Sequence, residues 1–405
     1  MPTRYGASPW IQRFPASRVP TFPRYRGDRA ADVVVIGGGL TGCATAHACA
    51  AAGLTTILLE RERIGHGRSG RGVGLLSTEP GPSFRDVVSA HGLKAAKRVF
   101  EAWRRGALDG AALLRRLGVQ CYLDPREALV VARGDQERDL RREHDGRREA
   151  GLDLAWLNRR QLQARMRLDA DGGLKTRDAF MLDPYRACLG LAAAAAARGA
   201  HCFERSRVKK VRFTRKLAEV IVDQGRIQAR RVIVATATAT DEFRSLRRHL
   251  DRRETYVVLT ERMPAAMRKE LGDRRVMLRG PGGLPDYAGW THDDRLIISG
   301  ADLPETPERK RPNILVQRTG ELMYEVLRLY PAISGLQPEF GWESVYGRAA
   351  DGLMYIGAHR NYPHHFFAIG GHAASVTGAF VAARILLRAV EERPDKADEV
   401  FGWNR

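Results

Sequence analysis

The sequence predicts an α/β protein in which a parallel sheet is joined to an α+β part with a mostly antiparallel sheet. Its length of 405 residues, 44% of them hydrophobic, allows two or more domains. Residues 32–60 follow the order strand, glycine-rich turn, helix and strand, which is typical of a parallel βαβ unit. Residues 254–300 alternate apolar and polar side chains between Gly and Pro turns, which favours an antiparallel sheet.

Residues 1–30 precede the first strand and are rich in Pro, Arg and aromatic side chains ("SPWIQRFPASRVPTFPRYRG"). This composition predicts an extended arm that lies on the body of the protein. The arm has no apolar segment of the secretory type, and the chain has no run of about eighteen apolar residues, so we expect no membrane span. The five cysteines are scattered without a CxxC or His/Cys cluster. They predict reduced thiols, a cytoplasmic location and no metal site.

The strand that begins at Val33 runs into the motif "VVVIGGGLTGCATA". Gly37, Gly39 and Gly42 satisfy the spacing GxGxxG, with Leu40 and Thr41 between the last two glycines, and a helix is expected from Thr41 to Gly53. The first glycine permits the turn, the second lets the backbone approach a pyrophosphate, and the third lets helix and strand pack closely. Free N–H groups at the helix start favour an anion. The motif predicts a dinucleotide site, with a glycine turn that binds nothing as the alternative.

The second strand, "TTILLE", ends in an acid, Glu60, followed by Arg61. An acid about twenty residues after the glycines is placed to accept hydrogen bonds from ribose hydroxyls. A carboxylate would repel a 2′-phosphate, which argues against NADP. This pattern alone leaves FAD and NAD open.

The remaining elements follow from periodicity and from turn residues. We expect amphipathic helices near 84–117 and 135–150, an alanine-rich helix over 182–200, and strands over 207–213, 217–223 and 226–237. The last region, from 351 to 390, reads as strand, loop, strand, glycine turn and long helix. No internal repeat is visible.

Three separated blocks resemble the D-amino-acid oxidase superfamily, in the branch of the glycine, sarcosine and γ-glutamylputrescine oxidases. The first is "ADVVVIGGGLTGCATAHACAAAGLTTILLERERIGHGRSGRGVGLLS", and the second runs from "DPYRACLGLAAAAAARGAHCFERSRVKKV" to "GRIQARRVIVATAT". The third joins "WESVYGRAADGLMYIG" to "FFAIGGHAASVTGAFVAARILL". Together they span most of residues 31–390 in the order that the family has.

The resemblance implies FAD as the cofactor, bound by a Rossmann-like domain that is interleaved with the substrate domain. The FAD-binding domain would comprise residues 31–82, 171–245 and 340–405, and the substrate domain residues 83–170 and 246–339. Beyond the motif and Glu60 with Arg61, the resemblance implies these FAD-binding residues: Ser69, Gly70, Arg71, Val208, Ala235, Thr236, Gly370, Gly371 and Val376.

The resemblance also implies oxidation of a C–N bond in an amine or amino-acid derivative, with hydride transfer to flavin N5 and formation of an imine. Members that bind a substrate carboxylate carry an Arg four residues after the tryptophan, where this chain has Tyr346. Members with covalent FAD have a Cys where this chain has Ser344, so we expect non-covalent FAD. The chain also departs from the family at Ala237, which often is Gly.

The closing turn departs from the family as well, because Ala373-Ala374-Ser375 precedes Val376 in place of Gly-His-Gly. Tyr346, Arg348 and His372 are the candidate catalytic residues, against the alternatives of sheet packing and a surface histidine. Five further positions are candidates for contact with the substrate, with packing in the core as the alternative: Tyr256, Arg279, Tyr287, Trp290 and His292. The "HRNYPHH" stretch is interpreted as a surface loop.

The formal net charge of +20 admits an anionic partner, but the charged segments mix both signs, which is typical of solvated helix faces. The expected partners are a small-molecule amine or amino acid and an electron acceptor, oxygen or another carrier. Two alternatives stay open: a family member that acts on an aminomethyl group of tRNA, and a flavin-bound protein without catalysis.

Overall fold

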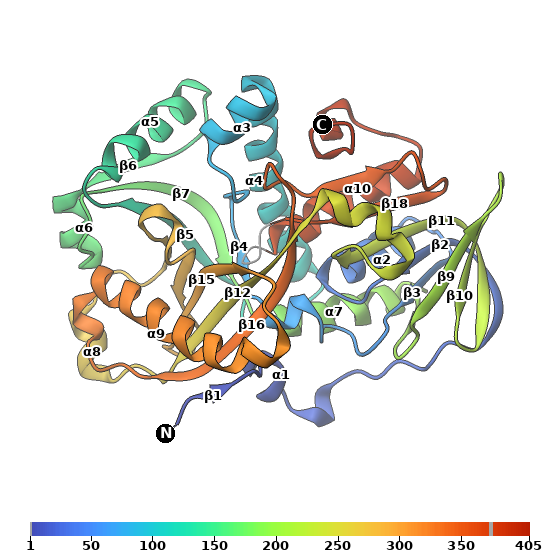
Figure 1. Ribbon diagram of the computed structural model, residues 1–405, viewed down its shortest axis with the longest axis horizontal. Helices are drawn as coiled ribbons and strands as arrows, with labels where there is room; N and C mark the ends of the chain where they lie inside the picture. The colour runs from blue at the N-terminus through green and yellow to red at the C-terminus, as the bar shows by residue number, and fades with distance from the viewer. Residues whose placement is uncertain (1, 372–375) are drawn as a thin grey trace.

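The computed structural model describes residues 2–371 and 376–405, which form two sheets side by side (Figure 1). The larger sheet has the strand order β1-β16-β12-β15-β14-β13-β5-β7-β4, with β6 against β7. Its strands are β1 (Arg4–Tyr5), β4 (Leu75–Leu76), β5 (Asp124–Ala132), β6 (Ala155–Asn158), β7 (Gly172–Met181), β12 (Asp251–Thr260), β13 (Val276–Arg279), β14 (Tyr287–Trp290), β15 (Leu296–Pro304) and β16 (Pro338–Arg348).

The smaller sheet has the order β17-β18-β11-β2-β3-β8, and the meander of β9 and β10 extends from β11. Its strands are β2 (Gly27–Ile36), β3 (Thr56–Leu59), β8 (His201–Phe203), β9 (Val208–Phe213), β10 (Ala218–Val222), β11 (Gly225–Ala237), β17 (Tyr355–Ala358) and β18 (His365–Ile369). The pairs β11–β2, β2–β3, β3–β8 and β11–β18 are all parallel. The predicted α/β class is therefore confirmed.

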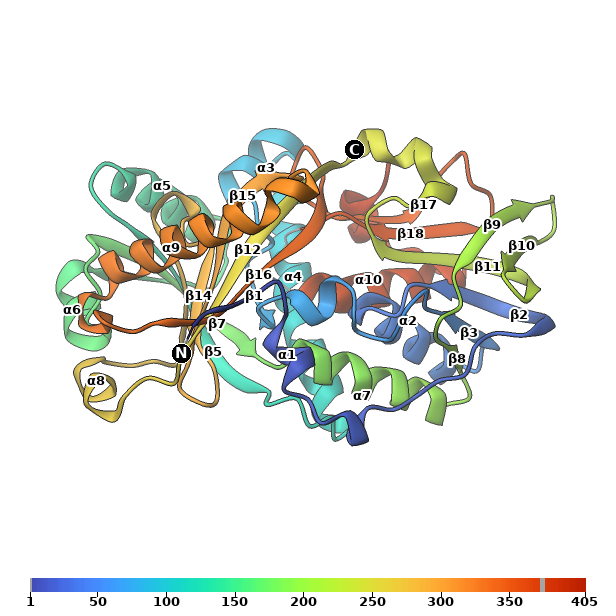
Figure 2. The ribbon, with the colours of Figure 1, turned by 60° about the horizontal axis from the view of Figure 1, so that its bottom comes forward.

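Helices cover one face of the smaller sheet (Figure 2). They are α2 (Leu40–Ala51), α7 (Pro184–Ala197) and α10 (Thr377–Val390), and α2 packs between the other two. Val33 and Val35 of β2 point into the core on this side. Val34 and Ile36 belong to the core on the other side, together with Phe243 of the 3-10 helix η3 (Asp241–His249). Because β2 is buried on both faces, it reads as a continuous apolar run in the sequence.

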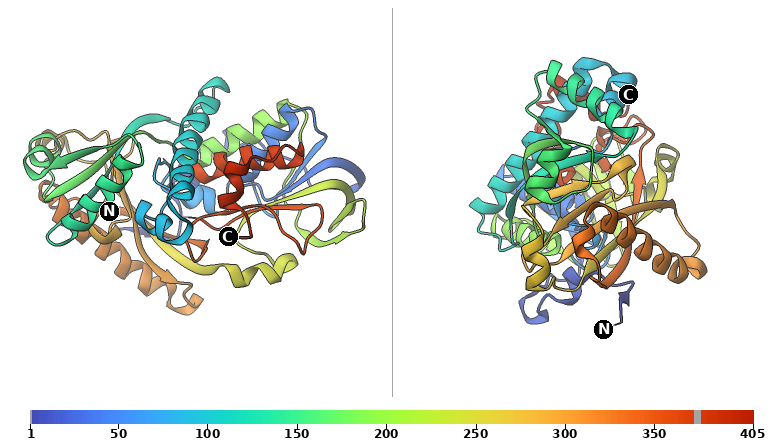
Figure 3. Two further views of the ribbon diagram at one scale, coloured as in Figure 1. Left: turned by 90° about the horizontal axis from the view of Figure 1, so that it is seen from above. Right: turned by 90° about the vertical axis from the view of Figure 1, so that its left-hand side faces the viewer.

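The larger sheet is mostly antiparallel, as predicted, with parallel pairs only at β1–β16 and β13–β5 among the described strands. Helix α9 (Arg311–Leu329) covers the face that carries Tyr256 and Val258. The opposite face carries Val257 and Trp342 and shares one apolar core with α2 and α10. Helix α4 (Leu93–Arg116) runs between the two halves and contacts both β7 and α10 (Figure 3).

The N-terminal residues form the expected arm, which passes from the larger sheet to the smaller one (Figure 2). The arm contains β1 and two short helices, α1 (Pro9–Gln12) and η1 (Ala16–Arg18). Trp10 is buried, and its indole Nε1–H donates a hydrogen bond of 2.8 Å to the carbonyl of Gly72. The arm therefore supports, from outside, the segment that follows the first two strands of the smaller sheet.

The predicted long helix over 84–117 is in fact two helices, α3 (Phe84–His91) and α4. Gly92 separates them at φ +82°, a conformation that side chains rarely adopt and that interrupts the helix. Helix α5 (Gln136–Glu149) lies where it was expected.

The division into two domains stays a prediction. Strands β4, β7 and β16, which fall in segments assigned to the FAD-binding domain, hydrogen-bond into the larger sheet. Within the part of the chain that the structure describes, no helix is long and apolar enough to cross a membrane.

Candidate functional site

The glycine motif forms a tight turn between β2 and α2, and the geometry shows why glycine is needed. Gly37 has φ +110°, and a Cβ atom there would lie 2.6 Å from the carbonyl oxygen of Ala235. A Cβ at Gly42 would lie 1.8 Å from the carbonyl oxygen of Gly37. The first and third glycines thus allow the turn and the close packing of helix on strand that their spacing predicts.

Two side chains from neighbouring segments hold this turn in place. Glu60 accepts hydrogen bonds from the N–H groups of Gly38 (2.7 Å) and Glu62 (2.8 Å). Ser69, in the 3-10 helix η2 (Arg68–Arg71), accepts one of 2.8 Å from the N–H of Leu40. Burial raises the pKa of Glu60, although the two backbone hydrogen bonds act in the opposite direction. The protein itself therefore holds the turn in place, through the Glu60 carboxylate and the Ser69 hydroxyl.

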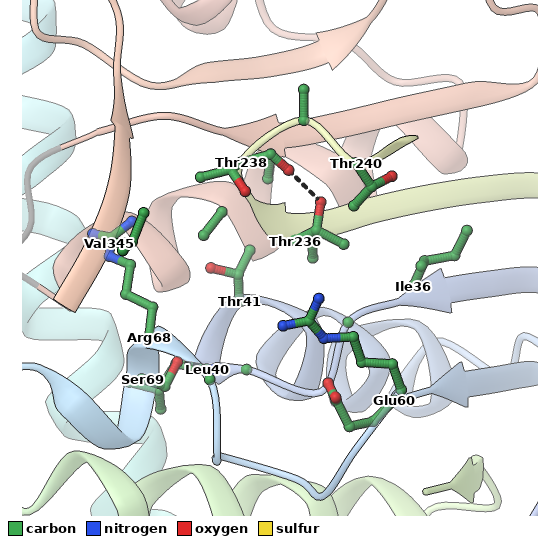
Figure 4. Close-up of a pocket in the computed structure, with 18 of the residues that line it drawn as sticks. Ile36, Leu40, Thr41, Glu60, Arg68, Ser69, Thr236, Thr238, Thr240 and Val345 are labelled. Carbon is green, nitrogen blue, oxygen red and sulfur yellow. Dashed lines mark hydrogen bonds between the residues drawn. The ribbon is translucent and has the colours of Figure 1, made fainter. Parts of the chain in front are cut away.

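A cavity of about 710 Å³ lies over the turn (Figure 4). It is bounded by the start of α2, the end of β3, η2, the segment from Thr236 to Phe243, and Glu343–Val345 of β16. Most of the predicted FAD-binding residues line it: Gly37, Gly39, Leu40, Thr41, Glu60, Arg61, Ser69, Arg71, Val208, Ala235, Thr236, Gly370 and Val376. Its volume is in the range of pockets that bind small molecules and cofactors.

The other predicted cofactor residues take different places. Gly42 and Gly70 lie behind the lining, and a Cβ at Gly70 would meet the carbonyl oxygen of Gly65 at 2.3 Å. Gly371 has φ +97° and packs against Met354, which itself lines the cavity. His372 and the three residues after it lie outside the described residues.

One end of the cavity lies beside Glu60, between Val208 and the segment formed by the end of β11 and the residues after it. In this segment the Thr236 hydroxyl donates a hydrogen bond of 2.8 Å to the carbonyl of Thr238 (Figure 4). Ala237 has φ +65°, the left-handed conformation that favours glycine. The departure from the family at this position therefore carries some backbone strain.

The other end of the cavity meets β16 of the larger sheet. Arg68 extends from η2 toward Val345 (Figure 4), and burial lowers the pKa of its guanidinium to about 10. Arg71 donates to Glu343 and accepts, through its carbonyl, the Nε1–H of Trp342 at 2.8 Å. The sequence did not single out Arg68, because nothing in its neighbours distinguishes a cavity-facing Arg from a solvated one.

These features fit FAD. The start of α2 offers backbone N–H groups to an anion, the glycines leave room for a pyrophosphate, and Glu60 has lone pairs left for ribose hydroxyls. At the far end the buried Ser344 hydroxyl, which lines the cavity, has no hydrogen-bond partner among the described residues. A cofactor with polar groups at both ends suits a cavity of this kind.

The candidate substrate residues lie on two faces of the larger sheet. Tyr346 is buried and donates its hydroxyl hydrogen to the Asp302 carboxylate. Burial, and then the charge of Asp302, raise the pKa of Tyr346 above its usual range, so it remains a donor. Arg348 is exposed at the end of β16 and is not among the cavity-lining residues. The structure thus places Tyr346 near the cavity wall and Arg348 toward solvent.

The remaining candidates are distributed over the larger sheet. Tyr256 donates to Glu254 beneath α9, and Trp290 packs against Tyr330 in the same core. His292 stacks on Tyr122. Tyr287 is buried on the face opposite α9. These four side chains do not form one cluster.

Arg279 donates a hydrogen bond of 2.9 Å to the carbonyl of Gly81 and lies 3.5 Å from Asp286. It is therefore engaged in holding the sheet. The "HRNYPHH" stretch is less exposed than predicted, since His359 and His365 are buried in an aromatic cluster with Phe367. Among the described residues, no three His, Cys, Asp or Glu side chains gather as metal ligands would.

Comparisons with known proteins agree with this geometry. Residues 32–389 match the family described as "DAO: FAD dependent oxidoreductase". Gamma-glutamylputrescine oxidoreductase of Escherichia coli (strain K12) is 25% identical over 379 residues, which cover 90% of this chain and 85% of the relative.

Solved structures share the fold over nearly the whole chain. Glycine oxidase from Geobacillus kaustophilus has a TM-score of 0.77 at 19% identity, covering 93% of this chain and 99% of that chain. L-proline dehydrogenase from P. horikoshii has a TM-score of 0.74 at 16% identity, covering 94% and 97%. With the matched family, the glycine cradle and the cavity above it, the chain belongs to the DAO family of FAD-dependent oxidoreductases.

Proposed function

We propose that this protein oxidises a C–N bond of an amine or amino-acid derivative, with non-covalently bound FAD as the electron acceptor. The observation that carries the proposal is the course of the cavity, which joins the glycine turn at one end to the polar side chains of β16 at the other. The relatives named for γ-glutamylputrescine, glycine and L-proline support a substrate that contains a C–N bond.

Bound FAD supplies a two-electron acceptor, so that hydride leaves the carbon that bears nitrogen and an imine results for water to hydrolyse. The chain's own residues bind and orient. The N–H groups at the start of α2 would hold the pyrophosphate, and Glu60 would hold the ribose. Ser344 lines the cavity on β16, and Trp103 and Met354 add apolar surface to the lining, which helps to exclude water.

Non-covalent binding is supported by the lining of the cavity, since none of the described lining residues is a cysteine. The five cysteines are all buried and free. Acid precipitation of the purified protein should leave the yellow cofactor in solution, and colour that stays with the pellet would contradict this part of the proposal.

The central experiment is anaerobic titration of the yellow holoenzyme with amines and amino acids. A substrate should bleach the visible flavin absorbance and yield an aldehyde or a keto acid after hydrolysis of the imine. A holoenzyme that no amine and no amino acid bleaches would sink the proposal and favour a flavin-bound protein without catalysis. Reoxidation by oxygen or by a quinone then identifies the electron acceptor.

The charge distribution supports a small-molecule substrate over tRNA. On the exposed β9–β10 meander, Lys209 lies 3.1 Å from Asp223 and Arg212 lies 3.8 Å from Glu219, so these cations are paired with acids of the same sheet. If the affinity for tRNA falls with salt no more steeply than the affinity for another polyanion does, tRNA is not recognised specifically, in agreement with a small-molecule substrate. A cytoplasmic location stays a prediction from the scattered thiols.

A further inference from the structure

Two buried cysteines lie directly behind the glycine turn. Cys43 belongs to α2 and Cys188 to α7, and both side chains are 0% exposed. Their Sγ atoms are 3.7 Å apart, although the two residues are 145 positions apart in the sequence. Neither cysteine lines the cavity, so contact with a ligand does not explain the pair.

Both thiols address one backbone carbonyl, that of Gly38. The thiol of Cys188 donates to this oxygen over 3.3 Å, and the thiol of Cys43 over 3.5 Å. The N–H of Gly65 donates to the same oxygen over 2.9 Å. A thiol donates only while it is protonated. The pKa of Cys43 is raised, first by its hydrogen bond with Cys188 and then by burial, so its thiol keeps the hydrogen that it donates.

Gly38 is fixed on its other side as well. Its N–H donates to the Glu60 carboxylate over 2.7 Å. A Cβ atom at this position would lie 2.7 Å from Cδ1 of Ile64 and 2.9 Å from Cβ of Glu60, so the backbone here is enclosed. The protein therefore holds both polar groups of Gly38, and the two thiols contribute to the hold on its carbonyl.

The direction of this carbonyl decides where the next N–H points. The Gly38 carbonyl and the Gly39 N–H belong to one planar trans peptide unit, in which the two groups point in opposite directions. Because the carbonyl points back toward Cys188 in α7, the Gly39 N–H points away from α7, toward the cavity that Gly39 lines.

The Gly39 N–H is also left over when the hydrogen bonds of the turn are counted. The N–H of Gly38 goes to Glu60, and the N–H of Leu40 goes to Ser69. The N–H between them, that of Gly39, has no hydrogen-bond partner among the described residues. A backbone N–H at the start of a helix that faces a cavity is a donor for an anion.

We propose that Cys43 and Cys188 are positioning residues for the cofactor, whose thiols hold the Gly38–Gly39 peptide so that the Gly39 N–H is presented to the pyrophosphate of FAD. Neither thiol touches the cofactor. An N–H that is already oriented binds an anion without the cost of ordering the backbone. This role rests on the proposed place of the pyrophosphate at the start of α2, and it does not depend on which substrate is oxidised.

Equilibrium dialysis of the full-length holoenzyme measures the effect on FAD affinity. Cys188→Ala should weaken FAD binding about threefold, and Cys43→Ala together with Cys188→Ala about tenfold, because one or both thiol hydrogen bonds to Gly38 are lost. Cys188→Ser keeps a donor of similar size, so its FAD affinity should lie within about twofold of the wild type. Wild-type affinity in the double variant, or a loss in Cys188→Ser as large as in Cys188→Ala, would overturn the proposal.

Cys49 offers a matched control for packing. It lies later in α2, is also 0% exposed, and donates no hydrogen bond to the turn among the described residues. Cys49→Ala and Cys188→Ala should lower the Tm in saturating FAD by similar amounts, because each leaves a small cavity beside α2. Only Cys188→Ala should weaken FAD binding. Equal losses of FAD affinity in the two variants would assign the effect to packing and overturn the proposal.

Displacement of FAD from the holoenzyme by ADP and by adenosine locates the lost contact. Adenosine has no pyrophosphate, so in the double variant it should displace the weakened FAD at about tenfold lower concentration than in the wild type. ADP, whose pyrophosphate would depend on the same N–H, should need an unchanged concentration. An unchanged requirement for adenosine would mean that the whole cradle has loosened, which would overturn the proposal.

The positioning role and the proposed oxidation fail separately. If the variants weaken FAD binding as expected but no amine bleaches the holoenzyme, the role of the thiols stands and the oxidation is refuted. If an amine bleaches the flavin and all the variants retain FAD equally, the oxidation stands and the role of the thiols is refuted.

Discussion

The two ends of the cavity are built in opposite ways. At the α2 end the contacts come from glycine backbone and from N–H groups, and the two side chains that join them, Glu60 and Ser69, are already hydrogen-bonded. At the β16 end they come from Glu343, Ser344 and Val345, which are distant in the sequence from the glycine motif, and the buried Ser344 hydroxyl has no partner among the described residues. A site made of backbone is encoded in one short motif, whereas a site made across strands depends on register.

The larger-sheet half contains two kinds of buried polar side chains, those with hydrogen-bond partners and those without. Arg147 is buried and makes paired hydrogen bonds of 2.9 Å to the two oxygens of Glu79, and one of 2.8 Å to Glu143. This cluster is satisfied internally, as structural polar networks are. The buried hydroxyls of Thr255, Ser299 and Ser344, by contrast, have no hydrogen-bond partner among the described residues, and Ser344 lines the cavity.

The largest expected effect tests the backbone end. Gly42→Ala places a Cβ 1.8 Å from the Gly37 carbonyl, so α2 must move away from β2. We expect purified protein that retains no FAD and loses more than about 3 kcal/mol of stability. Gly320→Ala, in α9 with open space around it, is the matched control and should gain up to about 1 kcal/mol. A normal FAD content in Gly42→Ala would contradict the inference that the close packing at Gly42 is needed for FAD binding.

The second effect tests the satisfied cluster. Arg147→Met leaves Glu79 and Glu143 buried without their cation, and we expect a loss of about 3–5 kcal/mol in the free energy of unfolding. Arg105→Met, which removes an exposed pair with Asp109, should change it by less than about 0.5 kcal/mol. Denaturant unfolding of both variants measures the difference, and similar losses would mean that the buried cluster has no special role.

The third effect concerns the acid of the cradle. Glu60→Gln keeps the shape but removes the charge that receives ribose hydroxyls, and we expect FAD affinity to fall roughly tenfold, about 1.4 kcal/mol. Burial raises the pKa of Glu60, so its carboxylate is lost early on acidification. Wild-type FAD affinity should therefore weaken as the pH falls through that raised pKa, whereas Glu60→Gln should show no such dependence. Equilibrium dialysis across pH distinguishes the two.

The smallest effect lies at the junction between the halves, where Asp183 caps α7 directly after β7. Its carboxylate accepts the N–H groups of Tyr185 and Arg186, yet burial raises its pKa to about 6. Because the pKa of Asp183 is raised in the folded protein, the protonated carboxyl group contributes to stability in full below the pKa that it has in the unfolded chain. This contribution is lost as the pH rises through about 6.

Asp183→Asn keeps the cap without the charge. We therefore expect the variant to match the wild type near pH 4 and to exceed it by about 1 kcal/mol above pH 7. Thermal unfolding at the two pH values checks this, and a variant that is less stable at the higher pH would show that the ionised carboxylate stabilises α7.

The sequence predicted the cradle in detail because each element of it is local. The spacing of Gly37, Gly39 and Gly42 and the acid at Glu60 all lie within one βαβ unit, and the family resemblance added Ser69 in the segment after it. The same local reasoning failed over 84–117, where a glycine in the left-handed conformation at Gly92 divides one expected helix into two.

What the sequence by itself determined is therefore the dinucleotide turn, the two sheet classes and, through resemblance, the family. Tertiary structure alone decided which side chains meet on the larger sheet. Tyr346 and Asp302 come together because β16 and β15 both flank β12, and a bulge shifts the register of β15 against it. Strand order and register arise from packing across the whole sheet, so no local pattern around Asp302 could reveal that it meets Tyr346.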